Sequence, residues 1–193
     1  MLKRLDKQFR AFWLNFVRSE SGVSAIEFTF VAPLIFLVMG ITLETGFMVF
    51  AESNLQAAVE DAARTIRTGN AQLGGVSSAT FKQNVCADIA YVANCSSITV
   101  YVRSEPDFAT LKANLPSLLT IGPSTDPKVT QPSCFKPGAP SNPAIVIATY
   151  DWYFVTFGMS AAFGNVAGNK ARRLVGMTLF QNQPYPGTGA GAC

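Results

Sequence analysis

The sequence contains no histidine, so the side chain that most often serves as a general base is missing. It also has no Gly-rich phosphate-binding loop and no Gly-x-Ser-x-Gly nucleophile motif. The segment Ser133-Cys134-Phe135-Lys136 matches Ser-x-x-Lys, but it lies in a Pro- and Gly-rich stretch, and we interpret the match as chance. Asp151, beside Trp152 and Tyr153, is interpreted as an ordinary strand-end carboxylate. We therefore expect no catalytic residue and no enzyme activity.

Cysteine is scarce, and no two cysteines form a Cys-x-x-Cys pair. Without such a pair and without histidine, we expect no metal site and no cofactor. An even number of cysteines in an oxidising compartment favours two disulfides, although four buried thiols are the alternative. Three connectivities are open, of which Cys86 with Cys95 is the local choice and leaves Cys134 with Cys193.

No Lys or Arg occurs between Arg18 and Arg64, while five stand at or before Arg18. Twelve of the sixteen residues from Phe28 to Leu43 are apolar, and the run resumes after Glu44 as far as Ala51. Such a stretch is long enough for a membrane helix, which needs about 20 mainly apolar residues. The basic excess before it predicts a cytoplasmic amino terminus and an exported remainder.

We call residues 1–22 the leader. Charge is balanced after it, because five of the fifteen basic and two of the twelve acidic residues precede Val23. No basic patch suggests nucleic acid as a partner. The leader places apolar residues on one face at helical spacing, so it either lies on an anionic membrane surface or is simply a basic leader. These apolar residues are Leu2, Leu5, Phe9, Phe12, Trp13 and Phe16.

Two carboxylates interrupt the apolar stretch, and burying either in lipid is unfavourable. Glu27 either turns toward water at the interface or pairs with another group. Cleavage after Gly22 would give Val23 a new ammonium, which Glu27 of a neighbouring helix could bind. Glu44 either contacts another helix or marks the outer end of the hydrocarbon layer. A secretory signal cut after Val49-Phe50-Ala51 is a competing interpretation, which the length of the apolar region and Glu44 disfavour.

Helical spacing continues to Gly69-Asn70, with Pro33 expected to loosen the helix locally. Downstream, the pattern predicts helices over 80–92 and 106–115, strands over 97–103, 145–157 and 174–180, a loop over 120–143 and a tail over 182–193. The expected fold class is α+β, with a long N-terminal transmembrane helix that continues into a small periplasmic domain with an antiparallel, pilin-like sheet.

The start of the helix resembles a type III signal, with Gly22, four residues, then Glu27-Phe28. The residues that follow resemble, in the same order, the TadE-like family of minor pilins or pseudopilins of the tight-adherence (Flp, type IVc) pilus system. Phe47 departs from that pattern, where a basic or polar residue is expected. The resemblance covers residues 22–64 and rests on Ala32-Pro33-Leu34, Gly40-Ile41, Leu43-Glu44-Thr45-Gly46, Leu55-Gln56-Ala57-Ala58 and Asp61-Ala62-Ala63-Arg64.

The resemblance implies a leader over 1–22, a long helix over 23–69 and a periplasmic domain over 70–193. Prepilin peptidase would cut between Gly22 and Val23, and Glu27, Phe28, Pro33 and Glu44 would act in assembly. The implied partners are the peptidase, other pilins or pseudopilins, the assembly platform and the membrane. The implied location is the bacterial inner membrane, single-pass, or the extracellular pilus used in surface attachment. A membrane-anchored periplasmic binding module that enters no filament is the alternative, and a secreted enzyme is a third.

Overall fold

The computed structural model describes residues 23–122, 134–166, 168, 170–187, 189, 191 and 193. The chain divides into two compact units, Met1–Thr42 and Leu43–Cys193. We call the second unit the sheet domain and describe each unit by itself. The expected leader and residues 123–133 of the expected loop lie outside the described residues.

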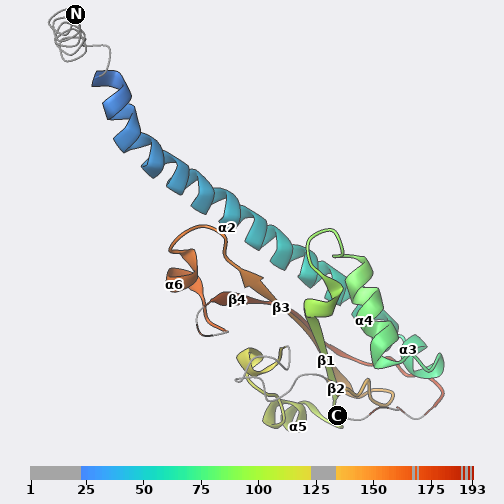
Figure 1. Cartoon of the computed structure of the whole chain (residues 1–193). Helices are drawn as coiled ribbons and strands as arrows, with labels where there is room; N and C mark the ends of the chain where they lie inside the picture. Colours follow the sequence, from blue (N-terminus) through green and yellow to red (C-terminus); the bar gives the residue numbers. More distant parts are fainter. Residues whose placement is uncertain are drawn as a thin grey trace, which may run out of the picture. The chain divides into compact units, whose positions relative to one another are not determined.

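Helix α2 (Val23–Arg67) supplies residues to both units and continues through Pro33 (Figure 1). It carries Arg64 and Arg67 in its last turn, where cations suit the negative end of the helix dipole. Gly69 follows with a φ of 80°, the left-handed conformation that glycine adopts most readily when a helix ends. The N–H of Gln183 donates to the Arg67 carbonyl at 2.8 Å, so the C-terminal tail satisfies one of the unpaired carbonyls of the last turn.

The described part of the first unit is the helical segment 23–42, and nearly all of its large apolar side chains are exposed. At 1.5 Å per residue these twenty residues extend about 30 Å, the thickness of a bilayer's hydrocarbon core. The hydroxyls of Thr29 and Thr42 donate to the carbonyls four residues earlier, at 2.7 and 2.8 Å, so both are satisfied within the helix. Among the described residues, α2 is the one helix that is long and apolar enough to cross a membrane.

The sheet domain holds four strands in the order β2-β1-β3-β4. Strands β1 (Ile98–Ser104), β3 (Pro143–Tyr153) and β4 (Ala171–Gln181) pair antiparallel. The short β2 (Cys134–Phe135) pairs parallel to β1, with Tyr101 opposite Cys134. The prediction of an antiparallel sheet is therefore wrong, and the sheet is mixed. The physical reason is the long connection from β1 to β2, which is long enough to return the chain in the same direction.

Short helices fill the connections of the sheet domain. Ser77 caps α4 (Ser78–Ala87) by accepting from the Thr80 N–H at 3.1 Å, so this helix starts and ends earlier than the 80–92 expected. Asp107 caps α5 (Phe108–Ala113) in the same way at 2.8 Å. The remaining short helices are α3 (Asn70–Leu73), η2 (Cys95–Ser97), η3 (Leu118–Thr120) and α6 (Met159–Phe163).

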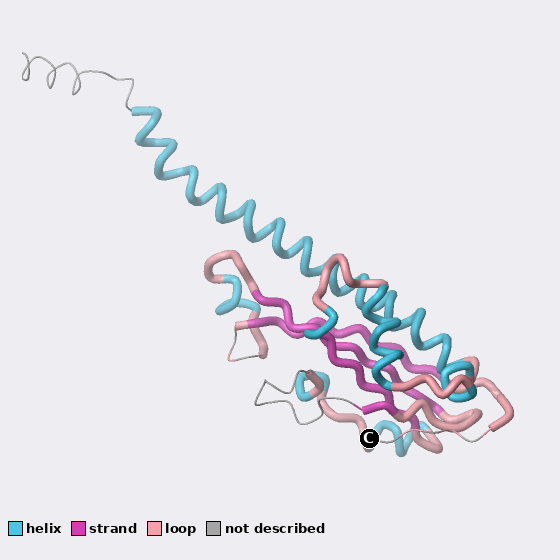
Figure 2. Tube along the Cα trace, turned by 45° about the vertical axis from the view of Figure 1, so that its right-hand side comes forward, coloured by secondary structure: helices cyan, strands magenta, loops and turns pink. Residues whose placement is uncertain are grey.

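Alternating strand residues give the sheet two apolar faces. Figure 2 shows the strands of this sheet in magenta, with helices beside them. Residues 43–67 of α2 and helix α4 cover one face, and α5 packs on the other. The first core includes Leu55, Val59, Ile66, Phe81, Val85, Ile98, Val100, Val102, Val146, Ala148 and Leu174. The second includes Tyr101, Leu111, Ile121, Ile145 and Ile147. The second half of α2 is therefore a structural part of the sheet domain.

Candidate functional site

The residues expected to act in processing and assembly lie at the start of α2. Val23 is its first residue, and Gly22 lies outside the described residues. Glu27, Phe28 and Pro33 are all exposed. Within the part of the chain that the structure describes, Glu27 has no hydrogen bond or ion pair. The geometry therefore leaves these side chains able to contact lipid or another helix, and their roles stay predictions.

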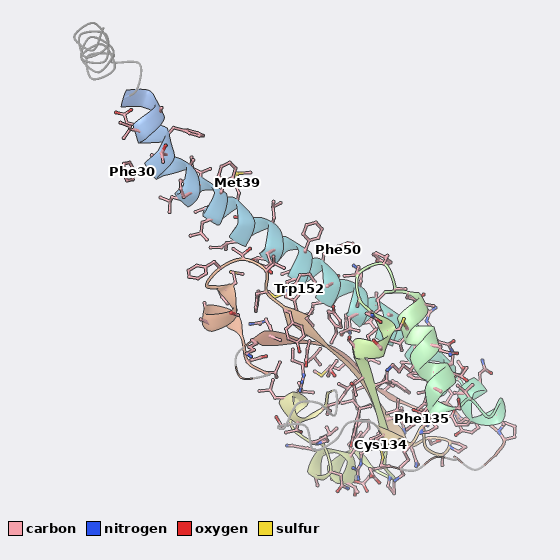
Figure 3. The ribbon with its side chains drawn as sticks, viewed as in Figure 1. Phe30, Met39, Phe50, Cys134, Phe135 and Trp152 are labelled. Atoms are coloured by element: carbon pink, nitrogen blue, oxygen red, sulfur yellow. A yellow bond between two sulfur atoms is a disulfide. The ribbon has the colours of Figure 1, made fainter. Side chains whose placement is uncertain are left out.

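The apolar surface that surrounds them covers the rest of the described part of the first unit, and exposed apolar residues continue along α2 as far as Phe50. Figure 3 shows Phe30 and Met39 projecting away from the α2 backbone. The large side chains at Ile26, Leu34, Ile35, Phe36, Leu37 and Val38 are exposed as well. An apolar surface on all sides of a helix is typical of a membrane span.

Glu44 lies two residues after this segment and is buried, with 8% of its surface exposed. Its Oε1 accepts the Val155 N–H at 2.6 Å, and its Oε2 accepts the Thr156 N–H at 2.9 Å. Both N–H groups follow the end of β3, where the chain leaves the sheet. Charge-assisted bonds of this kind are about twice as strong as neutral ones. We call this contact the Glu44 clamp.

The Glu44 clamp bears on the two interpretations of this residue. The carboxylate has partners, but they belong to the same chain and to the sheet domain. The contact does not test whether Glu44 marks the outer end of the hydrocarbon layer, and that interpretation stays a prediction, as does a role for Glu44 in assembly. The clamp was not predicted from the sequence, because no local pattern connects residue 44 to a loop more than a hundred positions later.

Gln56 forms a second polar contact between α2 and the sheet. Its amide accepts the Met177 N–H at 2.9 Å and donates to the Met177 carbonyl at 3.0 Å. It also donates to Glu60 at 2.7 Å. Since β4 is an outer strand, the amide occupies backbone groups that an added strand would otherwise pair with. The sequence shows a polar residue beside the apolar Leu55, but no pattern in it indicates that Gln56 contacts Met177.

Gly176 permits the close approach of α2 to β4. A Cβ at this position would lie 2.8 Å from the Leu55 carbonyl oxygen and 3.1 Å from the Gln56 nitrogen. Backbone atoms cannot move aside without shifting the helix, so only glycine fits here. Gly176 and Gln56 thus set the distance and the register of the second half of α2 on the sheet.

A buried ion pair links the ends of β3 and β4. Arg173 donates to the two Asp151 oxygens at 2.7 and 2.9 Å, and both side chains are almost fully buried. The third nitrogen of its guanidinium donates to the Leu119 carbonyl at 2.5 Å, and Gly122 lies against the group. The arrangement satisfies both charges internally, as buried charges require. Asp151 therefore has a structural contact, in agreement with its interpretation as a strand-end carboxylate.

Glu105 joins β1 to the segment after β2. It accepts from Arg103 at 2.8 Å and from Lys136 at 3.1 Å, and it is itself buried. Burial opposes ionisation of Glu105, but the hydrogen bonds from Arg103 and Lys136 outweigh it, so the pKa lies below its ordinary value. Lys136 is also the lysine of the Ser-x-x-Lys match, and its ammonium is engaged in this ion pair.

Two disulfides stabilise the sheet domain. Of the three possible connectivities, the structure has the one that contains the local pair, Cys86 with Cys95. Cys86 bonds Cys95 and joins α4 to η2, while Cys134 bonds Cys193 and joins β2 to the tail. The expectation of two disulfides is thereby confirmed. Among the described residues, no group of three or more potential metal-ligating side chains comes together.

Two open hollows lie on the surface of the sheet domain. One, of about 430 Å³, lies beside the Cys86–Cys95 bond and is lined by Ala79, Lys82, Gln83, Ala87 and Ser96. The other, of about 250 Å³, lies between α2 and β4, beside Glu60, Arg64 and Arg67.

Comparison with known proteins gives one match. The family model of the TadE-like proteins matches residues 22–64, which run from the residue before α2 to its last turn. Glu27, Glu44 and Gln56 all lie within the match, whereas the strands of the sheet lie outside it. No curated protein and no solved structure matches the chain. The expected resemblance to the TadE-like family is confirmed over this segment.

Proposed function

We propose that the protein is a minor pilin or pseudopilin of a tight-adherence pilus, released for assembly by cleavage between Gly22 and Val23. The observation that carries the proposal is the division of α2 within the TadE-like match. Its first twenty residues expose apolar side chains, and its remainder packs on the sheet domain. Such a helix suits a protein that is anchored in the inner membrane by one span before assembly and then packs against other helices.

Glu27 is the residue that would set the register between subunits. Cleavage after Gly22 creates an ammonium at Val23, four residues before this carboxylate. Charges in the apolar interior of a membrane or a filament are rare and are usually matched by a partner. In the proposed assembly, the Glu27 carboxylate of one subunit binds the Val23 ammonium of its neighbour. The described residues leave the carboxylate accessible for that contact.

The amino-terminal residue and intact mass of the membrane-extracted protein test the proposal directly. They should be measured in cells with and without prepilin peptidase. A start at Val23 that depends on the peptidase supports the pilin pathway. A start at Glu52 would contradict it, because cleavage there removes the proposed span and leaves a secreted domain. An intact Met1 would favour the anchored periplasmic binding module instead.

The pairing of Glu27 is tested by Glu27→Gln, which removes the charge at almost constant volume. We expect cleavage and folding to persist while incorporation into filaments is lost. Glu52→Gln is the matched control, because Glu52 also lies on α2 but beyond the proposed span. Normal piliation of the Glu27→Gln variant would contradict the pairing.

A further inference from the structure

The loop between β3 and α6 exposes apolar side chains to an unusual degree. Val155 has 93% of its surface exposed and Phe157 has 91%. Tyr153, the last residue of β3, and Phe163 at the end of α6 are exposed too. Isolated exposed apolar residues are common, but a contiguous group of them marks an interaction site.

The Glu44 clamp determines where this loop lies along α2. The carboxylate holds the backbone N–H groups of Val155 and Thr156, and both partners belong to the sheet domain. Glu44 is two residues beyond Thr42, the last residue of the first unit, and the exposed apolar residues continue past it with Phe47, Val49 and Phe50. Along the chain, the loop is therefore attached just after the residue at which a span over 23–42 would end.

The charges around the loop have one sign. From Trp152 to Arg172 the sequence contains no Asp or Glu, but it contains the exposed Lys170 and the half-buried Arg172. Arg172 lies opposite Trp152 in the β3–β4 ladder, and Lys170 precedes that strand. The neighbouring carboxylates, Asp151 and Glu44, are both buried and hydrogen-bonded. Aromatic side chains beside Lys and Arg are typical of segments that lie at a membrane surface.

We propose that Val155 and Phe157 insert into the bilayer that α2 crosses, with Lys170 and Arg172 binding anionic lipid headgroups. This inference rests on the proposed membrane anchoring of α2. The chain would thus contact the membrane at two places, the span and the loop. The loop would have to leave the lipid when a subunit enters a filament.

The test uses the full chain in vesicles of phosphatidylethanolamine and phosphatidylglycerol. A spin label is attached to a single added cysteine at Val155→Cys or Phe157→Cys, after mass measurement shows that both native disulfides are intact. Relaxation by oxygen, which enters lipid, is compared with relaxation by a water-soluble nickel chelate. Phe36→Cys reports on the span, and Leu73→Cys, exposed on α3 beyond the end of α2, reports on water.

We expect labels at 36, 155 and 157 to relax severalfold more with oxygen than with nickel, and the label at 73 to show the reverse. Oxygen preference at 36 with nickel preference at 155 and 157 would overturn the loop insertion while α2 stays anchored. Nickel preference at 36 would overturn the anchoring itself, and the insertion with it. Protection of 155 and 157 from both reagents would overturn lipid as the occupant and indicate a second copy of the chain.

The charge requirement is tested separately with Lys170→Glu and Arg172→Glu in one variant. We expect the oxygen preference at 155 and 157 to fall severalfold while the preference at 36 stays unchanged. The same fall in oxygen preference at 155 and 157 is expected when the labelled protein keeps Lys170 and Arg172 but the vesicles consist of neutral phosphatidylcholine. An unchanged preference in both cases would overturn the role assigned to anionic lipid.

Discussion

The two halves of α2 belong to one helix but face different surroundings. Residues 23–42 expose nearly every large apolar side chain, and Leu43, Phe47, Val49 and Phe50 are exposed as well. From Ala51 onward, the large apolar side chains of α2 are buried on the sheet. Leu34 has 62% of its surface exposed and Leu55 has 1%. The same residue type is therefore exposed in one half and buried in the other. The spacing of the buried positions also distinguishes the halves, because only the second half repeats them at three- and four-residue intervals.

Polar contacts follow the same division. The second half carries Glu44 and Gln56, each hydrogen-bonded to backbone groups of the sheet domain. The first half carries Glu27, which has no such partner among the described residues. The difference suggests two uses of one helix, with the second half stabilising the domain and the first half available to lipid and to neighbouring subunits.

The largest difference between the halves should appear on truncating a leucine. Leu55→Ala removes a fully buried side chain and should lower the free energy of unfolding by about 2–5 kcal/mol. Leu34→Ala removes a side chain that the domain does not contact and should leave that free energy nearly unchanged. Denaturant unfolding of the full chain in detergent, followed by Trp152 fluorescence, measures both; Trp152 packs against the core that α2 covers (Figure 3). Equal losses would contradict the division of the helix.

Two glycine substitutions compare a position that α2 contacts closely with one that nothing contacts. Gly176→Ala places a methyl group against the α2 backbone and should destabilise the sheet domain by about 1–3 kcal/mol. Gly46→Ala meets nothing within 4 Å and should stabilise α2 slightly, by up to about 1 kcal/mol. Thermal unfolding followed by circular dichroism distinguishes the two. If Gly176→Ala is neutral, the helix does not lie as close to β4 as the structure indicates.

The two glutamates offer a third contrast, with a smaller effect. Glu44→Gln keeps one oxygen acceptor but loses the charge, so the Glu44 clamp should weaken by about 1–2 kcal/mol. Hydrogen exchange at the Val155 and Thr156 amides should accelerate accordingly. Glu27→Gln should leave both amides unchanged. Acceleration in the Glu27→Gln variant would mean that the first half of α2 also supports the domain.

These contrasts show which features the sequence could predict. The long helix, its end near Gly69, the three longer strands and the inward face of Leu55, Val59 and Ile66 follow from periodicity and glycine placement, which are local. The mixed sheet was not predicted, because β2 has only two residues and no local pattern encodes its direction beside β1.

The contacts of the candidate site were harder to predict from the sequence. The Glu44 clamp and the Gln56 contact each join residues more than a hundred positions apart, and a single sequence does not encode such pairs in any local pattern. The disulfides were easier to predict, since four cysteines allow three pairings and one of these pairings closes a short loop. Glu27 was identified from its position relative to Gly22 and the apolar run, and the structure leaves its proposed partner to experiment.

The smallest expected effect concerns pH, and it tests whether buried charge is confined to the sheet domain. Glu105 has a pKa below its ordinary value because Arg103 and Lys136 bind its ionised form. A lowered folded-state pKa contributes stability that is present above the unfolded value, about 4.3, and is lost as pH falls through the folded value. Stability should therefore decline in that acidic range and decline less steeply in Glu105→Gln. Urea unfolding at a series of pH values measures the slopes. Glu27→Gln should reproduce the unaltered slope, because Glu27 lies outside the sheet domain, and a flattened slope there would place the carboxylate of the span in the folding equilibrium after all.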